Sequence, residues 1–217
     1  MANLNKFIEH TLLKQDAVYE DFIKLFDEAK EYEFLGVCIN PCYVSMAKDY
    51  LKDSGVKVVT VIGFPLGANK TEVKAFEAAQ AVKDGADELD MVINVTELKN
   101  KNFDFVVNDI KKVKEACNGK PLKVILETDL LNQAEIKKAC ELCIEAKADF
   151  VKTSTGFVKG GVGAKAEDVE LMFKTVSPYG LKVKASGGVR SRADAIKMLE
   201  SGAERIGTSS GVKIVSE

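Results

Sequence analysis

Short apolar, β-branched runs alternate with longer amphipathic stretches along the whole chain, and this rhythm constrains the fold more than any other feature. Regular alternation predicts parallel strands joined by right-handed helical crossovers. The expected strands are 8–12, 36–40, 56–63, 88–94, 122–128, 150–155, 181–186 and 205–208. The expected helices are 17–33, 43–53, 71–84, 103–116, 133–147, 167–176 and 192–201, followed by a last turn at 212–215.

Eight strand–helix units predict the α/β class and a single (β/α)8 TIM barrel, which we expect to occupy residues 1–217 as one domain. No Pro-, Gly- or Ser-rich linker divides the chain. A doubly wound open sheet is the alternative. It is less favoured because no G-x-G-x-x-G follows the first strand and no strand has the character of an edge.

Capping signals agree with these boundaries. Asp16, Asn132 and Ser191 are the expected N-caps of the helices that follow them. Glycines between a helix and the next strand are expected in the left-handed conformation, at Gly36, Gly55, Gly85 and Gly202. Helical spacing in the stretch 71–84 predicts one face that packs on the sheet. That face consists of Val73, Phe76, Glu77, Gln80 and Ala81.

Composition excludes several classes of function. The 31 Lys and Arg nearly balance the 33 Asp and Glu, and a net charge of −2 makes a nucleic-acid partner unexpected. No apolar run approaches the ~20 residues that span a bilayer. Residues 1–13 lack the apolar centre of a signal peptide. Five scattered Cys, an odd number, indicate free thiols and a cytoplasmic location.

Metal ligands of the usual kinds are scarce. His10 is the single His, so a multi-His metal site is excluded and any Ser-His-Asp arrangement would have to use His10. Cys140 and Cys143 form a C-x-x-C inside the expected helix 133–147, with no second pair elsewhere. Two helix thiols are therefore a better interpretation of this motif than a zinc site.

Three charged residues, Asp90, Lys152 and Lys184, interrupt expected strands where apolar residues belong. Side chains alternate across a strand, and the apolar neighbours suit the face that packs on helices. Those neighbours are Leu89, Met91, Val151 and Val183. The three charged side chains are therefore expected to point into the barrel. Because buried charge is costly, such a cluster indicates function unless partners compensate it.

Amine chemistry follows from the placement of Lys152 and Lys184 on neighbouring strands, which lie ~4.8 Å apart in a sheet. A nearby like charge and partial desolvation both favour a neutral amine, and a neutral Lys attacks a carbonyl to form a Schiff base. Asp90, across the bore, is placed to move protons. A structural ion triad that closes the barrel, and strands that face the other way, are the alternatives.

Glycine-rich loops follow the last three expected strands, where barrels often bind phosphate. Free backbone N–H groups there favour an anion, and ordinary turns are the alternative. The candidate residues are Thr155, Gly156, Gly187, Gly188, Gly207, Ser209 and Ser210. Cys38 is expected to face inward near this site, although a buried Cys is often a small apolar filler. Glu9 and His10 either contact substrate or serve in packing, and the stretch 160–163 is a weaker candidate for a mobile lid.

The ordered motifs of this chain resemble those of the deoxyribose-phosphate aldolases, class I aldolases of the (β/α)8 type. The resemblance covers nearly the whole chain. It rests on residues 9–14, 37–41, 61–67, 70–72, 87–94, 123–128, 152–157 (KTSTGF), 184–190 (KASGGVR) and 207–211 (GTSSG). It implies reversible cleavage of 2-deoxy-D-ribose 5-phosphate to D-glyceraldehyde 3-phosphate and acetaldehyde, in deoxyribonucleoside breakdown, without a metal or an organic cofactor.

By the same resemblance, Lys152 is the Schiff-base lysine, and Asp90 with Lys184 is the proton-relay pair. The phosphate-binding backbone maps to Gly156, Gly187, Gly188, Gly207, Ser209 and Ser210. The implied partners are a small-molecule phosphosugar and acetaldehyde, with no nucleic acid and no membrane. Apolar outer faces of the helices lead us to expect a homodimer or a higher homo-oligomer.

The sequence departs from the family pattern at a few places, none of which touches the three charged strand residues. Phe157 replaces a Lys that reaches the phosphate in some members, and Glu9 replaces a common Asp. The loop 158–166 is slightly longer, and a Tyr-bearing C-terminal tail is missing from this sequence. Two other functions stay open: a phosphosugar isomerase or epimerase with purely electrostatic lysines, and a non-catalytic phosphometabolite-binding protein.

Overall fold

The computed structural model describes residues 3–217, and eight parallel strands in this range close into a barrel in sequence order. The strands are β1 (Ile8–Leu12), β2 (Gly36–Ile39), β3 (Lys57–Ile62), β4 (Glu88–Val92), β5 (Leu122–Ile125), β6 (Phe150–Lys152), β7 (Lys182–Ser186) and β8 (Arg205–Thr208). Pairing of β1 with β8 completes the ring. The predicted (β/α)8 TIM barrel is confirmed; residues 1 and 2 of the expected domain lie outside the described part.

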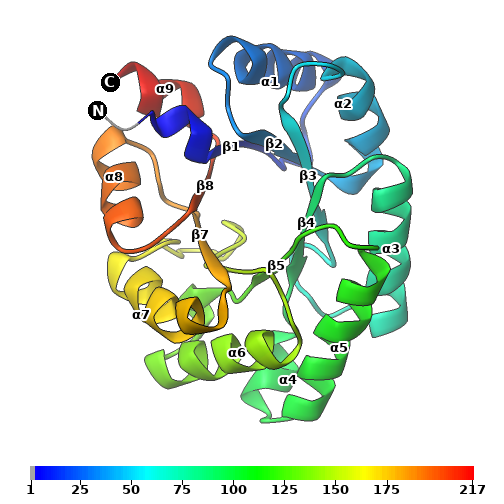
Figure 1. The fold of residues 1–217 in the computed structure, drawn as a ribbon, viewed down its shortest axis with the longest axis vertical. Helices are drawn as coiled ribbons and strands as arrows, with labels where there is room; N and C mark the ends of the chain where they lie inside the picture. The colour runs from blue at the N-terminus through cyan, green and yellow to red at the C-terminus, as the bar shows by residue number, and fades with distance from the viewer. Residues whose placement is uncertain (1–2) are drawn as a thin grey trace.

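Helices surround the barrel on its outer side, as Figure 1 shows in a view into the ring of strands from one end. They are α1 (Tyr19–Glu31), α2 (Val44–Tyr50), α3 (Thr71–Lys83), α4 (Val95–Lys99), α5 (Phe103–Ala116), α6 (Gln133–Glu145), α7 (Ala166–Val176), α8 (Arg192–Glu200) and α9 (Gly211–Ser216). Four short 3-10 turns are η1 (Leu4–Phe7), η2 (Pro41–Tyr43), η3 (Thr128–Leu130) and η4 (Ser177–Tyr179). Near the chain ends, η1 packs against α9. Within residues 3–217, none of the helices is long and apolar enough to cross a membrane.

Strand register decides which charged side chains meet inside the barrel. Lys152 on β6 is in register with Lys184 on β7, and Asp90 on β4 is in register with Lys123 on β5. Their apolar neighbours on these strands lie in the large core that also contains the buried faces of the helices. The predicted facing of these strands is therefore confirmed: apolar residues pack outward and charged residues point into the bore.

Most of the expected caps are confirmed, and two are wrong. The Asn132 and Ser191 side chains cap α6 and α8, and Gly55, Gly85 and Gly202 have positive φ. The chain enters α1 at Val18, whose N–H donates to the Asp21 carboxylate, so Asp16 is not the cap. Gly36 does not end a helix but begins β2. A Cβ on Gly36 would lie 2.7 Å from the Lys57 carbonyl oxygen, so close strand contact requires this glycine.

The buried face of α3 overlaps the predicted one only in part: Ala81 is buried as predicted and Glu77 is half-buried, but Gln80 is exposed. Val73 and Phe76 are 50% and 67% exposed, whereas Lys74 and Ala78 are fully buried. Packing of α3 on α5 places small residues and one charged residue at the helix interface. The prediction from helical spacing selected Val73 and Phe76 because they are apolar. The buried side of α3 instead contains a charged residue, Lys74, which a search for apolar spacing does not select. Helix α4, which the sequence pattern did not predict, is a short insertion before α5.

Candidate active site

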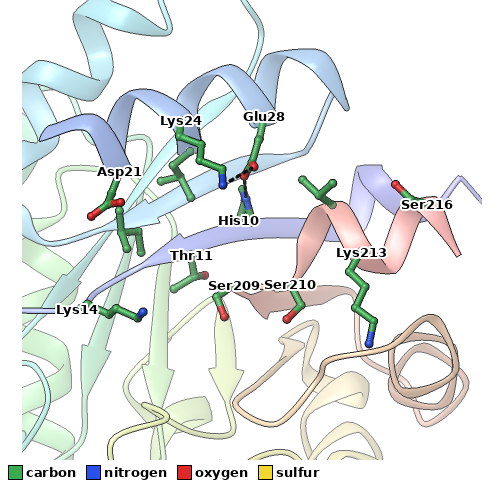
Figure 2. A pocket seen from close by; sticks show the side chains of 13 residues that line it. His10, Thr11, Lys14, Asp21, Lys24, Glu28, Ser209, Ser210, Lys213 and Ser216 are labelled. Atoms are coloured by element: carbon green, nitrogen blue, oxygen red, sulfur yellow. Dashed lines mark hydrogen bonds and ion pairs between the residues drawn. The ribbon is translucent and has the colours of Figure 1, made fainter. Parts of the chain in front are cut away.

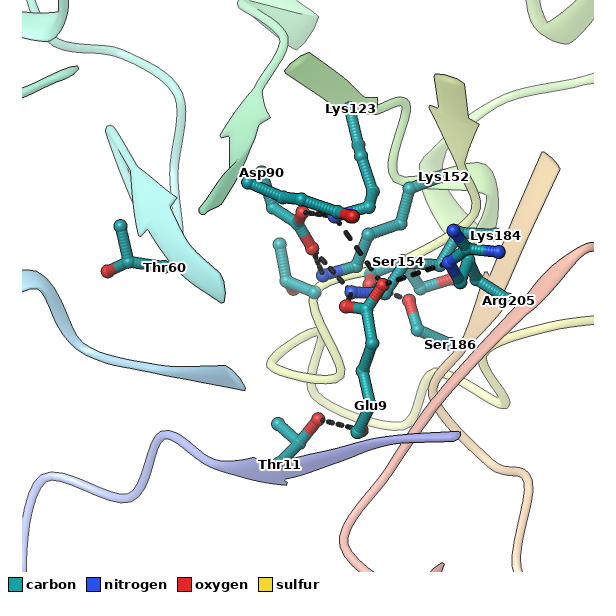
Figure 3. A network of polar contacts seen from close by, with 12 residues as sticks. Glu9, Thr11, Thr60, Asp90, Lys123, Lys152, Ser154, Lys184, Ser186 and Arg205 are labelled. Atoms are coloured by element: carbon teal, nitrogen blue, oxygen red, sulfur yellow. Dashed lines mark hydrogen bonds and ion pairs between the residues drawn. The ribbon is translucent and has the colours of Figure 1, made fainter. Parts of the chain in front are cut away.

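Asp90 is the centre of a buried ion network inside the barrel (Figure 3). Its Oδ2 accepts hydrogen bonds from Lys152 Nζ at 2.8 Å and from Lys184 Nζ at 2.6 Å. Its Oδ1 accepts one from Lys123 Nζ at 2.9 Å. The structure thus brings together the three charged residues that the strand pattern selected, and it adds a third lysine.

The network contains acidic and basic partners that sequence reasoning missed or left undecided. Lys123 Nζ lies 2.7 Å from Glu88 Oε2 and 3.4 Å from Glu9 Oε1. Glu9 also forms a direct ion pair with Lys184 and a looser one, at 3.9 Å, with Arg205. Lys123 carries the same signal as Lys152, a charge between apolar strand residues, and that signal was sufficient to find it.

Electrostatic compensation holds Asp90, Lys184 and Glu88 in their charged forms. Burial disfavours the charge of Asp90, but the ammonium groups of Lys123, Lys152 and Lys184 outweigh it and hold its pKa well below the usual range. Burial likewise opposes the charge of Lys184, but Asp90 and Glu9 raise its pKa above the usual value. The pKa of Glu88 falls from 4.5 to about 2, because Lys123 and Lys57 overcome its desolvation.

A cavity of about 250 Å³ lies above this network, at the carboxyl ends of the strands. Its walls come from the chain around Lys14, from the segment 152–157, and from the loops after β7 and β8. Lys152 is the one member of the Asp90 network that lines this cavity within the described residues, and it is 3% exposed. The other charged groups lie beneath it, away from the space a small molecule would fill.

Most of the predicted anion-binding residues line the same cavity. Gly156, Gly187 and Gly188 have φ values of 83°, 80° and 75°, a conformation that favours glycine. A Cβ on Gly188 would lie 2.2 Å from the Val162 carbonyl oxygen, so the neighbouring loop also excludes a side chain there. Gly207 makes room for the network itself, since its Cβ would lie 3.0 Å from Lys184 Cε.

Cys38 and Ser210 do not line this cavity, and Thr155 lines it with a hydroxyl that already has partners. Cys38 is fully buried among Leu13, Val59 and Val61, and it does not line the cavity. Burial raises the pKa of its thiol, which fits the alternative of an apolar filler. The Thr155 hydroxyl is engaged by its own turn: it donates to Glu127 and accepts from the Phe157 N–H.

Ser210 belongs to a neighbouring cavity of about 680 Å³ between β1, α1 and α9 (Figure 2). Its backbone N–H donates to the Thr208 hydroxyl at 2.9 Å. His10 also faces this side of the barrel wall, with Nε2 2.7 Å from Glu28 Oε2. Of the two roles expected for His10, contact with substrate or packing, this placement favours packing against α1. Ser209 lines both cavities.

Loops at the mouth of the cavity are tied to the barrel rather than free. The ring of Phe157 packs edge-on against Phe64, with ring centres 5.1 Å apart. In the predicted lid, the Gly163 N–H donates to the Asp129 carboxylate at 2.8 Å, and the Ala164 N–H donates to the Gly187 carbonyl. The loop therefore adjoins the glycine turn after β7.

The C-x-x-C thiols lie on α6, and both Cys140 and Cys143 are buried in the core between helix and sheet. Among residues 3–217, no group of three or more His, Cys, Asp or Glu side chains is arranged to hold a metal ion. Both thiols lie on the helix where the sequence pattern predicts them.

Comparisons with known proteins agree on one family. Residues 3–217 match the DeoC/LacD family aldolases. A deoxyribose-phosphate aldolase of Finegoldia magna is 57% identical over 212 residues, which cover 98% of each chain. The solved structure of "QR15, an aldolase" is 45% identical with a TM-score of 0.94, and the match covers 100% of this chain and 96% of that one. A tetrameric deoxyribose phosphate aldolase of Aeropyrum pernix is 35% identical with a TM-score of 0.91, covering 98% and 89%.

Proposed function

Because this chain belongs to the DeoC/LacD aldolase family, we propose that it uses Lys152 to cleave 2-deoxy-D-ribose 5-phosphate reversibly into D-glyceraldehyde 3-phosphate and acetaldehyde. The close relatives with full-length matches support the substrate and the lyase activity. One observation carries the choice of the nucleophile: Lys152 joins the buried ion network and also lines the cavity.

The chemistry begins at the Lys152 amine. The neutral amine attacks the C1 aldehyde of the open-chain sugar, and loss of water gives an iminium ion. Removal of the proton from the C3 hydroxyl leads to cleavage of the C2–C3 bond. The electron pair of that bond forms the C1=C2 double bond of an enamine and neutralises the iminium. The three-carbon fragment C3–C5 leaves as D-glyceraldehyde 3-phosphate. Protonation of the enamine at C2 and hydrolysis then release acetaldehyde and restore the amine.

Asp90 and Lys184 are the proposed proton-relay pair. Lys184 stays cationic between Asp90 and Glu9, so it disfavours a second positive charge on Lys152. Asp90 contacts both amines through one oxygen and, with an ordered water, is placed to move protons among the carbinolamine, the iminium and the enamine. These steps use amine, carboxylate and water only, so activity is expected to survive dialysis against a chelator.

Backbone groups at the cavity wall are the proposed phosphate site. Gly156, Gly187 and Gly188 expose backbone in conformations that leave no side chain between the N–H groups and an anion. Gly207 and Ser209 complete this wall. Ser210 is the weakest candidate because its N–H already has a partner. Position 157 carries no Lys, and the cationic residues that line this cavity besides Lys152 are Lys14 and Arg190.

Turnover separates this proposal from its rivals. Cleavage of deoxyribose phosphate, followed by the loss of NADH in a coupled assay of the released aldehydes, excludes a protein that only binds phosphometabolites. Incubation with acetaldehyde and borohydride is expected to inactivate the protein, because reduction of the imine leaves an ethyl group on the amine. An isomerase or epimerase with purely electrostatic lysines would keep its activity and its mass.

Two broader expectations belong to the same proposal. The chain is expected to form a homodimer or a larger homo-oligomer, a view that the tetrameric Aeropyrum pernix relative supports. Light scattering of the purified protein tests this, and a monomer at micromolar concentration would contradict it. Four buried, unpaired thiols and one exposed thiol suit a reducing cytoplasm, which fractionation of the source cells tests.

A further inference from the structure

Glu127, between β5 and η3, has an unusual backbone conformation and an unusual environment. Its φ of 62° and ψ of 63° lie in the left-handed region, which is costly for a residue with a side chain. Its side chain is nevertheless only 4% exposed. A buried carboxylate on a strained backbone persists where the surrounding structure fixes it, and such positions cluster at functional sites.

The Glu127 carboxylate is committed to a single turn. Oε1 accepts the Thr155 N–H at 3.0 Å, and Oε2 accepts the Thr155 hydroxyl. The same hydroxyl accepts the Phe157 N–H at 3.0 Å. Both oxygens of Glu127 therefore act as acceptors for Thr155.

The turn that Glu127 holds is part of the cavity wall. It starts three residues after Lys152 and presents Gly156, with its φ of 83°, to the cavity beside Gly187, whose ideal Cβ would lie 3.8 Å from Gly156 Cα. A Cβ on Gly156 would meet nothing within 4 Å, so this side of the turn faces open space. The hydrogen bonds of Thr155 order the other side of the turn.

We propose that Glu127 is a positioning residue that sets the 155–157 turn to receive the phosphate group of the substrate. The inference rests on the proposed function and adds to it the residue that orders one wall of the phosphate site. The left-handed backbone of Glu127 is needed because it aims the carboxylate across the strand ends at Thr155. A Gln at this position keeps the size but has one acceptor oxygen for the Thr155 N–H, and it places an NH2 donor where the second oxygen accepts the Thr155 hydroxyl.

Glu127→Gln and Glu127→Ala test this role against Glu135→Gln, a matched change in the capping box of α6. Both variants at position 127 are expected to lose about 10- to 100-fold in kcat/KM for 2-deoxyribose 5-phosphate, mainly through KM. Unphosphorylated 2-deoxyribose should be cleaved within about twofold of wild type, because only the phosphate contact is displaced. Borohydride trapping of acetaldehyde should also be unchanged, and Glu135→Gln should resemble wild type throughout.

Equal losses with both sugars in Glu127→Gln would overturn the positioning role, and so would an unchanged KM for the phosphorylated sugar. Glu127→Gln preserves volume, so it reports on the turn even where Glu127→Ala fails to fold. A wild-type protein that acetaldehyde and borohydride do not label would overturn the proposed function itself, an outcome distinct from either result for the variants.

Discussion

Two buried ion clusters in this protein have the same ingredients and different surroundings. In the bore, Asp90 and Lys184 are fully buried and 2.6 Å apart. Outside the barrel, between α3 and α5, Lys74 and Asp109 are equally buried and 2.7 Å apart. Burial of charge, which drew attention to the bore from the sequence, therefore does not by itself distinguish a catalytic site from a structural one.

The second cluster is closed on all sides. Lys74 Nζ also donates to the Val92 carbonyl at 3.1 Å, and the Thr71 hydroxyl donates to Asp109 at 2.8 Å. A Cβ on Gly63 would lie 3.0 Å from Lys74 Cε, so the loop after β3 rests on this side chain. One cation balances one anion, and each has further hydrogen bonds, so the pair serves to join helices to strand ends.

The bore cluster differs because one of its amines reaches open space. Three lysines share three carboxylates there, and Lys152 lines the cavity while the others stay below it. What distinguishes the proposed active site is a compensated buried amine that lines a cavity. The predictions that follow test this difference.

Lys152→Leu should have the largest effect. It removes the proposed nucleophile, and we expect kcat to fall by ~10⁴-fold or more. The protein should still fold, because Asp90 keeps Lys123 and Lys184 as partners. A coupled assay with circular dichroism as the folding control measures both, and turnover within tenfold of wild type would remove Lys152 from the mechanism.

Lys184→Leu should lower kcat by about 100-fold, in the range of a lost acid–base or electrostatic group. It should also shift imine formation to higher pH. Loss of Lys184 removes the cation that shares Asp90 Oδ2 with Lys152, so Asp90 then stabilises an ammonium at Lys152 more strongly. The rate of borohydride trapping as a function of pH reports this shift. An unchanged profile would contradict the like-charge argument.

Lys74→Met should lower stability and leave activity nearly unchanged, the opposite of what we expect for Lys152→Leu. Removal of one partner leaves Asp109 buried without its cation, and the free energy of unfolding should fall by ~3–5 kcal/mol. Activity per folded molecule should stay within about twofold, because the pair touches neither the cavity nor the network. Urea denaturation and the coupled assay separate the two readouts. A large loss of kcat with normal stability would show that the two clusters are not separate.

Acid should weaken the fold through the bore network. The pKa of Glu88 is about 2 in the folded protein and 4.5 normally, so its contribution to stability is complete above pH 4.5 and is lost as the pH falls toward 2. Asp90 shifts in the same direction and adds to this loss. Urea denaturation between pH 5 and 2 should show stability that declines with acid, and more shallowly in Glu88→Gln. Equal slopes would contradict the shift.

Sequence reasoning reached the barrel and its central trio for physical reasons that also explain its errors. The alternation of side chains along a strand can be recognised in a single sequence, so Asp90, Lys152 and Lys184 stood out against their apolar neighbours. Lys123 also stands between apolar residues, Leu122 and Val124, so the same signal could have selected it, and its register with Asp90 places it in the network.

Other features depend on contacts that no local pattern records. The predicted packing face of residues 71–84 does not include Lys74, because its partner Asp109 comes from a different helix 35 residues later. The left-handed conformation of Glu127 is not signalled by its residue type, since it arises from hydrogen bonds to Thr155 across the strand ends. Packing partners from distant segments decided each of these positions.

Peptide mapping after treatment with acetaldehyde and borohydride tests the distinction between the two clusters most directly. An ethyl group is expected on Lys152, with none on Lys184, Lys123 or Lys74, and prior addition of 2-deoxyribose 5-phosphate should slow the labelling. Modification of Lys184 in place of Lys152, or full turnover by a protein that carries no label, would contradict the account.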